Sequence, residues 1–297
     1  MFSKLSEPTR ANAYLFLTVT MLLWAGNHVI GRWAAGNIPP MTLAFLRWAG
    51  AALIVLPLAW PSLERDRTAI VENWRILLLL GLLGSGCYNT LQYIALTETT
   101  VANAAILNSW APVLIAGAAA VLFGDRLSRR QMGGLALSLV GVAIIILRGQ
   151  YATLAAFAFN RGDLVMVVAT AIWAAYTTLL RFRPPISTLS FAAVTYTIAG
   201  IANLPLAFYE YANGQRIVET WAALGAIVYA AVLASFVAYY LYARSVEIIG
   251  GTRTGSFIHL IPLFASVMGL VFLGETPQFY HAAGFALIVS GVWMAAR

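Results

Sequence analysis

Residues 111–142, APVLIAGAAAVLFGDRLSRRQMGGLALSLVGV, return in altered form as residues 261–292, IPLFASVMGLVFLGETPQFYHAAGFALIVSGV. The two stretches align without a gap, and prolines, glycines and an acidic position keep the same order in both. Such self-similarity indicates an internal duplication. The sequence therefore predicts two repeats, residues 1–150 and residues 151–297. The aligned pairs are Pro112 with Pro262, Gly124 with Gly274, Asp125 with Glu275, Gly134 with Gly284, and Gly141 with Gly291.

The composition places both repeats in a membrane. Hydrophobic residues make up 61% of the chain, charged residues make up 10%, and the mean hydropathy is +0.81. A soluble domain has about 25% charged residues, so most of this surface must face lipid. A run of about 20 mostly apolar residues is long enough to cross a bilayer as a helix. The predicted spans are 12–33, 41–60, 74–95, 101–123, 132–148, 163–182, 187–208, 221–243, 252–273 and 279–296.

Each repeat is predicted to hold five helices, and this odd number determines how the halves are related. The second copy must enter the membrane from the opposite face, so the repeats are inverted about an axis in the membrane plane. The predicted fold is an all-α membrane protein of ten transmembrane helices, arranged as two inverted five-helix repeats around a central cavity. Such repeats are typical of secondary transporters that bind substrate near the midplane, although channels can be built in the same way.

Positive charge is distributed unevenly between the predicted loops. One side holds most of the 18 Lys and Arg residues, whereas the other side holds Arg32, Arg148, Arg161 and Arg216. Because cytoplasmic loops carry the positive excess, we expect both termini in the cytoplasm and the protein in the cytoplasmic (inner) membrane. The net charge of +7 then follows from topology, and we expect no nucleic-acid partner. One copy is expected to suffice for function, with a dimer as the alternative.

Four stretches carry a resemblance to a known family: LLWAGNHVIGRWA (22–34), VANAAILNSWAPVLIAGAAAVLFGDRLS (101–128), RGDLVMVVATAIWAAYTTLLR (161–181) and GTRTGSFIHLIPLFASVMGLVFLGETPQFYHAAGFALIVSGV (251–292). The chain resembles the drug/metabolite transporter superfamily, and within it the ten-helix EamA-type exporters. The resemblance covers nearly the whole chain and implies an exporter.

The resemblance is less specific for the substrate. Members of this superfamily are associated with amino acids, other metabolites, purine-type compounds or toxic cations, and this chain is similar to the amino-acid exporters, including the aromatic branch. It therefore implies export of amino acids, particularly aromatic and other large neutral ones. Purines, other metabolites and toxic cations are the alternatives among transporters, and a channel is the alternative of another class.

Polar and aromatic side chains within the spans predict where the substrate binds. Spacings of three and four residues put Trp24, Asn27 and His28 on one face of the first helix. A polar side chain in hydrocarbon is costly and usually faces the bundle interior or a wet cavity, although bonding to neighbouring helices is the alternative. The repeat aligns these positions with Trp173, Tyr176 and Thr177, so we expect the two sets to face each other.

The remaining cavity candidates on the second, third and eighth helices are Arg47, Tyr88, Gln92 and Tyr239. Aromatic walls with hydroxyl tips suit a solute with an apolar body and a polar head. Arg47 could bind a substrate carboxylate as a bidentate partner. A structural tie of Arg47 to backbone carbonyls or to an acid is the preferred alternative. Tyr242 is predicted to belong to the interfacial belt or to helix packing.

Prolines interrupt the fourth and ninth helices beside further polar residues. Proline frees a carbonyl one turn back and kinks a helix, so polar groups at such a kink mark a binding site or a hinge. We predict Pro112 and Pro262 as hinges. The cavity candidates that precede them are Asn108 and Ser109 on the fourth helix, and Ser256 and His259 on the ninth. His259 could bind substrate or carry a proton, or it could be a hydrogen-bonded core histidine.

The glycines of the repeat predict a close helix contact. Gly134 and Gly141, like Gly284 and Gly291, lie seven residues apart on one helix face. Small residues let two backbones approach closely in a membrane. We therefore predict that the fifth and tenth helices pack together through these positions.

The sequence also argues against several functions. No acid lies near the middle of a predicted span, whereas proton-driven cation exporters usually need a buried carboxylate. Toxic cations are therefore disfavoured, and His28 and His259 are the only candidate proton carriers. The three histidines are too scattered for a metal site or a nucleophilic centre, so we expect neither an enzyme nor a cofactor. The expected partners are a small-molecule substrate and the lipid bilayer.

Overall fold

The computed structural model describes residues 9–34, 36–147, 160–272 and 278–296, and all regular elements among them are helical. The first repeat contains α1 (Arg10–Ala34), α2 (Pro40–Glu72), α3 (Trp74–Leu80), η1 (Gly81–Cys87), α4 (Tyr88–Glu98), α5 (Val101–Asn108), α6 (Ala111–Phe123) and α7 (Arg129–Ile146). The second contains α9 (Arg161–Leu179), η2 (Leu180–Phe182), α10 (Thr188–Ala212), α11 (Trp221–Val228), η3 (Tyr229–Val237), α12 (Ala238–Ile249), α13 (Gly251–Ser256), η4 (Phe257–His259), α14 (Leu260–Phe272) and α15 (Phe279–Ala296). The predicted boundary between the repeats, at residues 150 and 151, lies outside the described residues.

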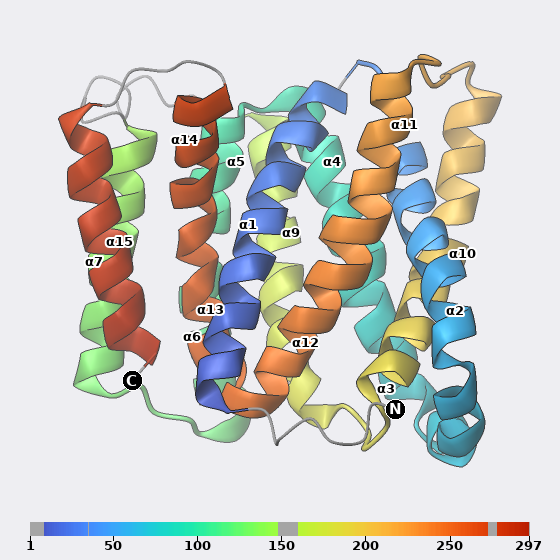
Figure 1. Cartoon of the computed structure of the whole chain (residues 1–297), viewed down its shortest axis with the longest axis horizontal. Coiled ribbons are helices and arrows are strands. Elements are labelled where there is room, and N and C mark those ends of the chain that lie inside the picture. Colours follow the sequence, from blue (N-terminus) through green and yellow to red (C-terminus); the bar gives the residue numbers. More distant parts are fainter. Residues whose placement is uncertain (1–8, 35, 148–159, 273–277, 297) are drawn as a thin grey trace.

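The helices stand side by side in one bundle (Figure 1). The helix α1 begins and α15 ends at the same face of this bundle, which we call the terminal face. Among the described residues, eight helices are long and apolar enough to cross a membrane. The predicted spans 74–95 and 252–273 are not among these eight, although helical elements cover residues 74–98 and 251–272.

The second predicted span ends too early at residue 60, because α2 continues to Glu72 through Pro57 and Pro61. The extension is supported at its far end by α10. There Asp66 Oδ2 accepts a hydrogen bond of 2.8 Å from the backbone N–H of Ser187, which is the N-cap of α10. A membrane helix tolerates an internal proline where neighbouring groups form hydrogen bonds with the backbone groups that the proline leaves unpaired.

Two helix pairs make the most extensive contacts between the predicted repeats. The most extensive contacts in the bundle are those of α2 with α10 and of α7 with α15, and each pair takes one helix from each repeat. The α2–α10 pair is held at both ends by carboxylates. Asp66 of α2 binds the start of α10, and Glu210 of α10 binds the start of α2, where it accepts from the N–H groups of Met41 (3.0 Å) and Thr42 (2.7 Å). This reciprocal pattern is what a two-fold axis between the halves would produce.

The predicted packing of the fifth and tenth helices is confirmed. A Cβ atom built on Gly134 would lie 2.6 Å from the carbonyl oxygen of Gly291, and one built on Gly291 would lie 2.6 Å from that of Gly134. Gly141 and Gly284 make a second contact of this kind, since a Cβ on Gly141 would lie 2.9 Å from the Gly284 oxygen. The absence of side chains at these positions lets the backbones of α7 and α15 touch.

The third and eighth predicted spans each contain a π-helix, η1 and η3, in corresponding places. A π-helical turn disturbs the regular backbone ladder and often occurs at functional sites. In both segments carbonyl oxygens accept side-chain hydrogen bonds from other helices. Gly84 O accepts from Tyr239 Oη at 3.2 Å, and Ala234 O accepts from Trp24 Nε1 at 3.1 Å. The two π-helices therefore anchor side chains in the bundle interior.

Candidate functional site

A cavity of about 730 Å³ opens at the terminal face, between the ends of α6, α9 and α12 and the start of α13. We call this cavity the vestibule. Its inner wall includes Thr177, Thr178 and Ile115, and its sides include Phe123 and Thr252. Of the cavity residues predicted from the sequence, only Thr177 lines it. The sequence did not point to the vestibule, because its charged residues follow helix ends and match the general bias of loop charge.

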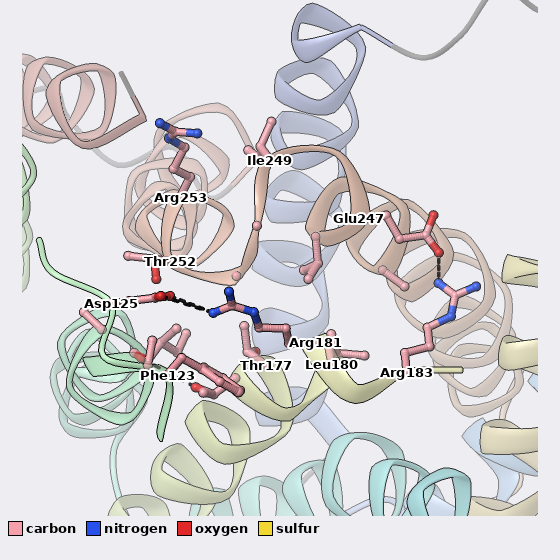
Figure 2. Close-up of a pocket in the computed structure, with 18 of the residues that line it drawn as sticks. Phe123, Asp125, Thr177, Leu180, Arg181, Arg183, Glu247, Ile249, Thr252 and Arg253 are labelled. Carbon is pink, nitrogen blue, oxygen red and sulfur yellow. Dashed lines mark hydrogen bonds and ion pairs between the residues drawn. The ribbon is translucent and has the colours of Figure 1, made fainter. Parts of the chain in front are cut away.

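Arginines outnumber acids around the vestibule. Figure 2 shows Arg181 extended toward Asp125, with 3.1 Å between Nη1 and Oδ2, and Arg183 directed toward Glu247, with which it forms an ion pair. Burial lowers the pKa of the Arg183 guanidinium to about 10, which leaves it protonated at neutral pH. Arg126 and Arg253 also line the cavity. The vestibule therefore presents a positive field to entering solutes.

Beyond Thr177 the interior is closed by packed rings. We call this group the aromatic cluster; its members are Trp24, Tyr88, Trp173, Tyr176, Tyr239 and Tyr242, all of them buried. Trp24 and Trp173 meet edge to face with 5.2 Å between ring centroids, and Tyr242 lies 5.1 Å from each. The Tyr242 hydroxyl is 3.0 Å from Thr177 Oγ1, which connects the cluster to the wall of the vestibule. The pairing of Trp24 with Trp173 brings together the two positions that the repeat aligns.

Tyr242 does not belong to an interfacial belt. Its side chain is fully buried between Trp24 and Trp173, so only the packing half of its prediction agrees with the structure. Its position near the end of the predicted span favoured the belt, but α12 continues to Ile249 and leaves this residue well inside the helix. The predicted span ended at residue 243, and the greater length of α12 explains why Tyr242 is buried rather than interfacial.

On the side of the aromatic cluster away from the vestibule, polar groups from several helices bind one another. This polar layer consists of Asn27, His28, Arg47, Gln92 and Tyr93, all buried. His28 Nδ1 donates to the Trp24 carbonyl at 2.8 Å, and His28 Nε2 accepts from Gln92 Nε2 at 3.0 Å, an arrangement that fits a neutral ring. Tyr93 Oη donates to Asn27 Oδ1 at 3.0 Å. The layer ties α1 to α4 and closes the bundle beyond the cluster.

Within the polar layer, Arg47 is the residue that bonds to η3. Its Nη1 donates to Tyr93 Oη at 2.8 Å, its Nη2 donates to Ala234 O at 3.0 Å, and its Nε donates to Ser235 Oγ. The side chain is fully buried. The sequence could not identify Ser235 as a partner, because a serine in an apolar run has no distinctive pattern. In this conformation Arg47 is tied to a backbone carbonyl and to hydroxyls.

The remaining predicted residues, Asn108, Ser109, Ser256 and His259, precede the two hinge prolines. Asn108 Oδ1 accepts from Tyr88 Oη at 3.2 Å, which joins Asn108 to the aromatic cluster. His259 contacts other partners: Nε2 donates to Ser109 O at 2.8 Å, and Ser138 Oγ lies 2.6 Å from Nδ1. Ser256 donates to Thr252 O. His259 therefore joins Ser109 and Ser138, whereas the described bond of Ser256 is to its own helix, and neither contact involves the polar layer.

Both predicted hinge prolines follow a break in helical geometry. Pro112 is in the first turn of α6, just after α5 has ended at Asn108. Pro262 is in the first turn of α14, just after the 3₁₀ segment η4. Their motion as hinges stays a prediction.

The arrangement predicts one-sided accessibility, which thiol labelling can measure. In a Cys87→Ser background, Thr252→Cys should react with an impermeant maleimide from the terminal face more than about tenfold faster than Asn27→Cys, because the aromatic cluster lies between the vestibule and Asn27 and must separate first. Arg67→Cys, an exposed position, is the positive control for that side. Equal labelling of Thr252→Cys and Asn27→Cys would contradict a closed aromatic cluster.

Comparisons with known proteins agree with this architecture. The model of the EamA-like transporter family matches residues 11–147 and 160–297. An uncharacterized transporter of Archaeoglobus fulgidus is 29% identical, and the alignment covers 96% of this chain and 97% of that protein. An S-adenosylmethionine/S-adenosylhomocysteine transporter of Chlamydia trachomatis is 25% identical, with 95% and 89% covered, and a probable terminal-alkyne amino-acid exporter of Streptantibioticus cattleyicolor is 24% identical, with 95% and 92% covered. One solved structure superposes with a TM-score of 0.78 at 20% identity over 97% of both chains, which shows the shared fold.

Proposed function

Because this chain belongs to the EamA-like transporter family, we propose that it exports small metabolites, specifically amino acids of the aromatic and other large neutral kinds, by alternating access. The proposed location is the cytoplasmic membrane, with both termini and the terminal face in the cytoplasm. Family and relatives are transporters rather than enzymes. The proposed partners are the solute and the lipid, with no nucleic acid, and one copy contains the whole pathway.

We further propose that ten helices cross the membrane as two inverted repeats. The two matches of the family model support this, as does the exchange of carboxylate caps between α2 and α10. The runs 74–98 and 251–272 are the two proposed spans beyond the eight that hydropathy selects. The run 74–98 carries buried polar side chains, such as Gln92, which lower the hydropathy of a helix whose polar face is turned inward.

One observation carries the mechanism: the vestibule opens at the terminal face, and its lining reaches Thr177, which bonds to Tyr242 of the packed aromatic cluster. A carrier must be closed on one side while it is open on the other, with the substrate between. In the proposed cycle the cluster and the polar layer separate as the vestibule closes, and Pro112 and Pro262 serve as hinges. A channel would need a continuous path through the bundle, and the aromatic cluster blocks such a path in this conformation. A channel is kept as the alternative of another class.

The chemistry of the pathway supports the amino-acid substrate. The rings of the aromatic cluster offer an apolar wall, and the arginines of the vestibule and Arg47 make its polar parts positive. A zwitterion with a large side chain fits both features, whereas a toxic cation would be repelled. Among the described residues the most deeply buried acids, Asp163 and Glu210, are bound at helix starts rather than in the pathway. The Streptantibioticus relative supports amino acids, and the Chlamydia relative keeps other metabolites as the alternative.

Counterflow into liposomes tests this proposal. Vesicles preloaded with unlabelled solute should accumulate labelled phenylalanine in a saturable way, and Trp24→Ala should raise the KM roughly tenfold, since it removes aromatic contacts. Trp60→Ala is the matched control, because Trp60 is exposed and should leave the KM unchanged. Counterflow of only a nucleoside or a quaternary cation would refute the substrate class. Ionic current without counterflow would indicate a channel.

A further inference from the structure

The surroundings of Arg47 contain more hydrogen-bond donors than acceptors. A guanidinium has five N–H bonds, and the structure assigns acceptors through three nitrogens: Tyr93 Oη, Ser235 Oγ and Ala234 O. The neighbouring residue, Trp48, is also fully buried, and among the described residues its Nε1–H has no acceptor. The Arg47 guanidinium carbon lies 5.1 Å from the centroid of the Trp48 ring, so both donor groups belong to one small region.

The charge of Arg47 is also unpaired by any carboxylate in the described part of the chain. Its hydrogen-bond partners are neutral, and the ion pairs of the described residues involve other arginines. Rings of Trp48, Tyr93 and Tyr239 lie within 5.9 Å of the guanidinium carbon. Cation–π contacts offset part of the cost of burying the charge, but a buried ion is normally compensated by an opposite charge as well.

We propose that Arg47 and Trp48 form a subsite for the carboxylate of the transported solute. This inference rests on the proposed function and deepens it: the solute must carry a carboxylate, and its apolar body lies against the aromatic cluster. A carboxylate is anionic and accepts only, so it complements both the charge and the surplus donors, and it can bind a guanidinium through two parallel hydrogen bonds. Tyr93 Oη and Ser235 Oγ occupy part of the guanidinium while the subsite is closed.

The location of the subsite fits a cycle with two open states. Arg47 lies on the side of the aromatic cluster away from the vestibule, in contact with Tyr239 through its guanidinium and with η3 through Ala234 O and Ser235 Oγ. A solute that passes the cluster from the vestibule would meet this guanidinium next. Its carboxylate would replace Ser235 or Tyr93 as the partner, and loss of the Arg47–Tyr93 bond would loosen the polar layer on the opposite side. The subsite thus couples binding of the polar head to opening of the other face.

Binding of matched neutral and anionic probes tests the subsite without requiring transport. The probes are 3-phenylpropionate and 3-phenylpropionamide, which have the same aromatic body, and binding is measured as ligand-dependent thermal stabilisation of the detergent-purified protein. Wild type should prefer the carboxylate by about tenfold or more in Kd, and Arg47→Gln should reduce this preference to within about twofold. Trp48→Phe, which removes one N–H and keeps a ring, should reduce it about threefold. Trp60→Phe, an exposed position on the same helix, is the matched control.

The outcomes separate this inference from the proposed function. Preference for 3-phenylpropionate that depends on Arg47, without phenylalanine counterflow, would support the subsite and refute amino-acid export. Phenylalanine counterflow, with the full preference for 3-phenylpropionate retained in Arg47→Gln, would support amino-acid export and overturn the subsite. Absence of any preference in the wild type would overturn the subsite. If Arg47→Gln does not fold, Trp48→Phe decides the question, since an unchanged preference in that variant would also overturn it.

Discussion

Replacing Gly134 by alanine should lower the free energy of unfolding by about 3 kcal/mol, at the upper end of what overpacking of a core usually costs. The added Cβ would lie 2.6 Å from the backbone nitrogen of Ala295 and 2.6 Å from the carbonyl oxygen of Gly291. Both are main-chain atoms, so no rotamer change relieves the clash, and α15 would have to move away from α7. Gly291→Ala should have a similar effect, since its Cβ would lie 2.5 Å from the Ser138 nitrogen.

Thermal unfolding in detergent, followed by tryptophan fluorescence, measures these changes. The matched controls are Gly117→Ala and Gly133→Ala. A Cβ on Gly117 meets nothing within 4 Å, and one on Gly133 meets only the end of the flexible Met294 side chain at 3.5 Å. Both controls should be neutral or stabilising by about 0.5–1 kcal/mol, because alanine favours a helix interior over glycine. A Gly134→Ala protein as stable as Gly117→Ala would show that α7 and α15 do not touch at this position.

Replacing Glu210 by alanine should lower the free energy of unfolding by about 2–4 kcal/mol. The carboxylate accepts from the backbone N–H of Met41 at 3.0 Å, and from both the N–H and the hydroxyl of Thr42 at 2.7 Å and 2.8 Å. These bonds fulfil the role of a helix cap, since Pro39 supplies no side-chain cap to α2. Glu210 is only 2% exposed, so water would not fully replace it. Hydrogen exchange of Met41 and Thr42, together with the unfolding temperature, measures the loss.

Two variants define the role of Glu210 more closely. Glu210→Gln keeps one acceptor oxygen and should lose about half as much stability as Glu210→Ala. Glu219→Ala removes an exposed carboxylate from the loop that follows α10 and should change stability by less than about 0.5 kcal/mol. Unchanged exchange of Met41 and Thr42 in Glu210→Ala would show that the start of α2 does not depend on α10.

Several elements were predictable because they depend on patterns that are local or repeated along the chain. Hydropathy located the helices, although it ended the second span before residue 72, where proline and charged residues follow the apolar run. The repeat identified both glycine pairs and aligned Trp24 with Trp173, whose rings meet in the structure. These predictions succeeded because duplication keeps equivalent positions on equivalent faces. The charged vestibule was not predicted, since Arg181 and Asp125 are distant in sequence and each resembles an ordinary loop residue.

The sequence by itself determined the lipid environment, the duplicated plan and the identity of the polar residues inside the helices. Each depends on composition or on periodicity, which a single chain displays in full. Only the tertiary structure decided that fourteen predicted cavity residues are buried in this conformation, with Thr177 alone among them on the vestibule wall. It alone assigned neutral partners to Arg47 and left Trp48 Nε1 without an acceptor among the described residues. The physical reason is that hydrogen bonds between helices depend on which faces meet and in which state the bundle is closed, and no sequence spacing specifies either.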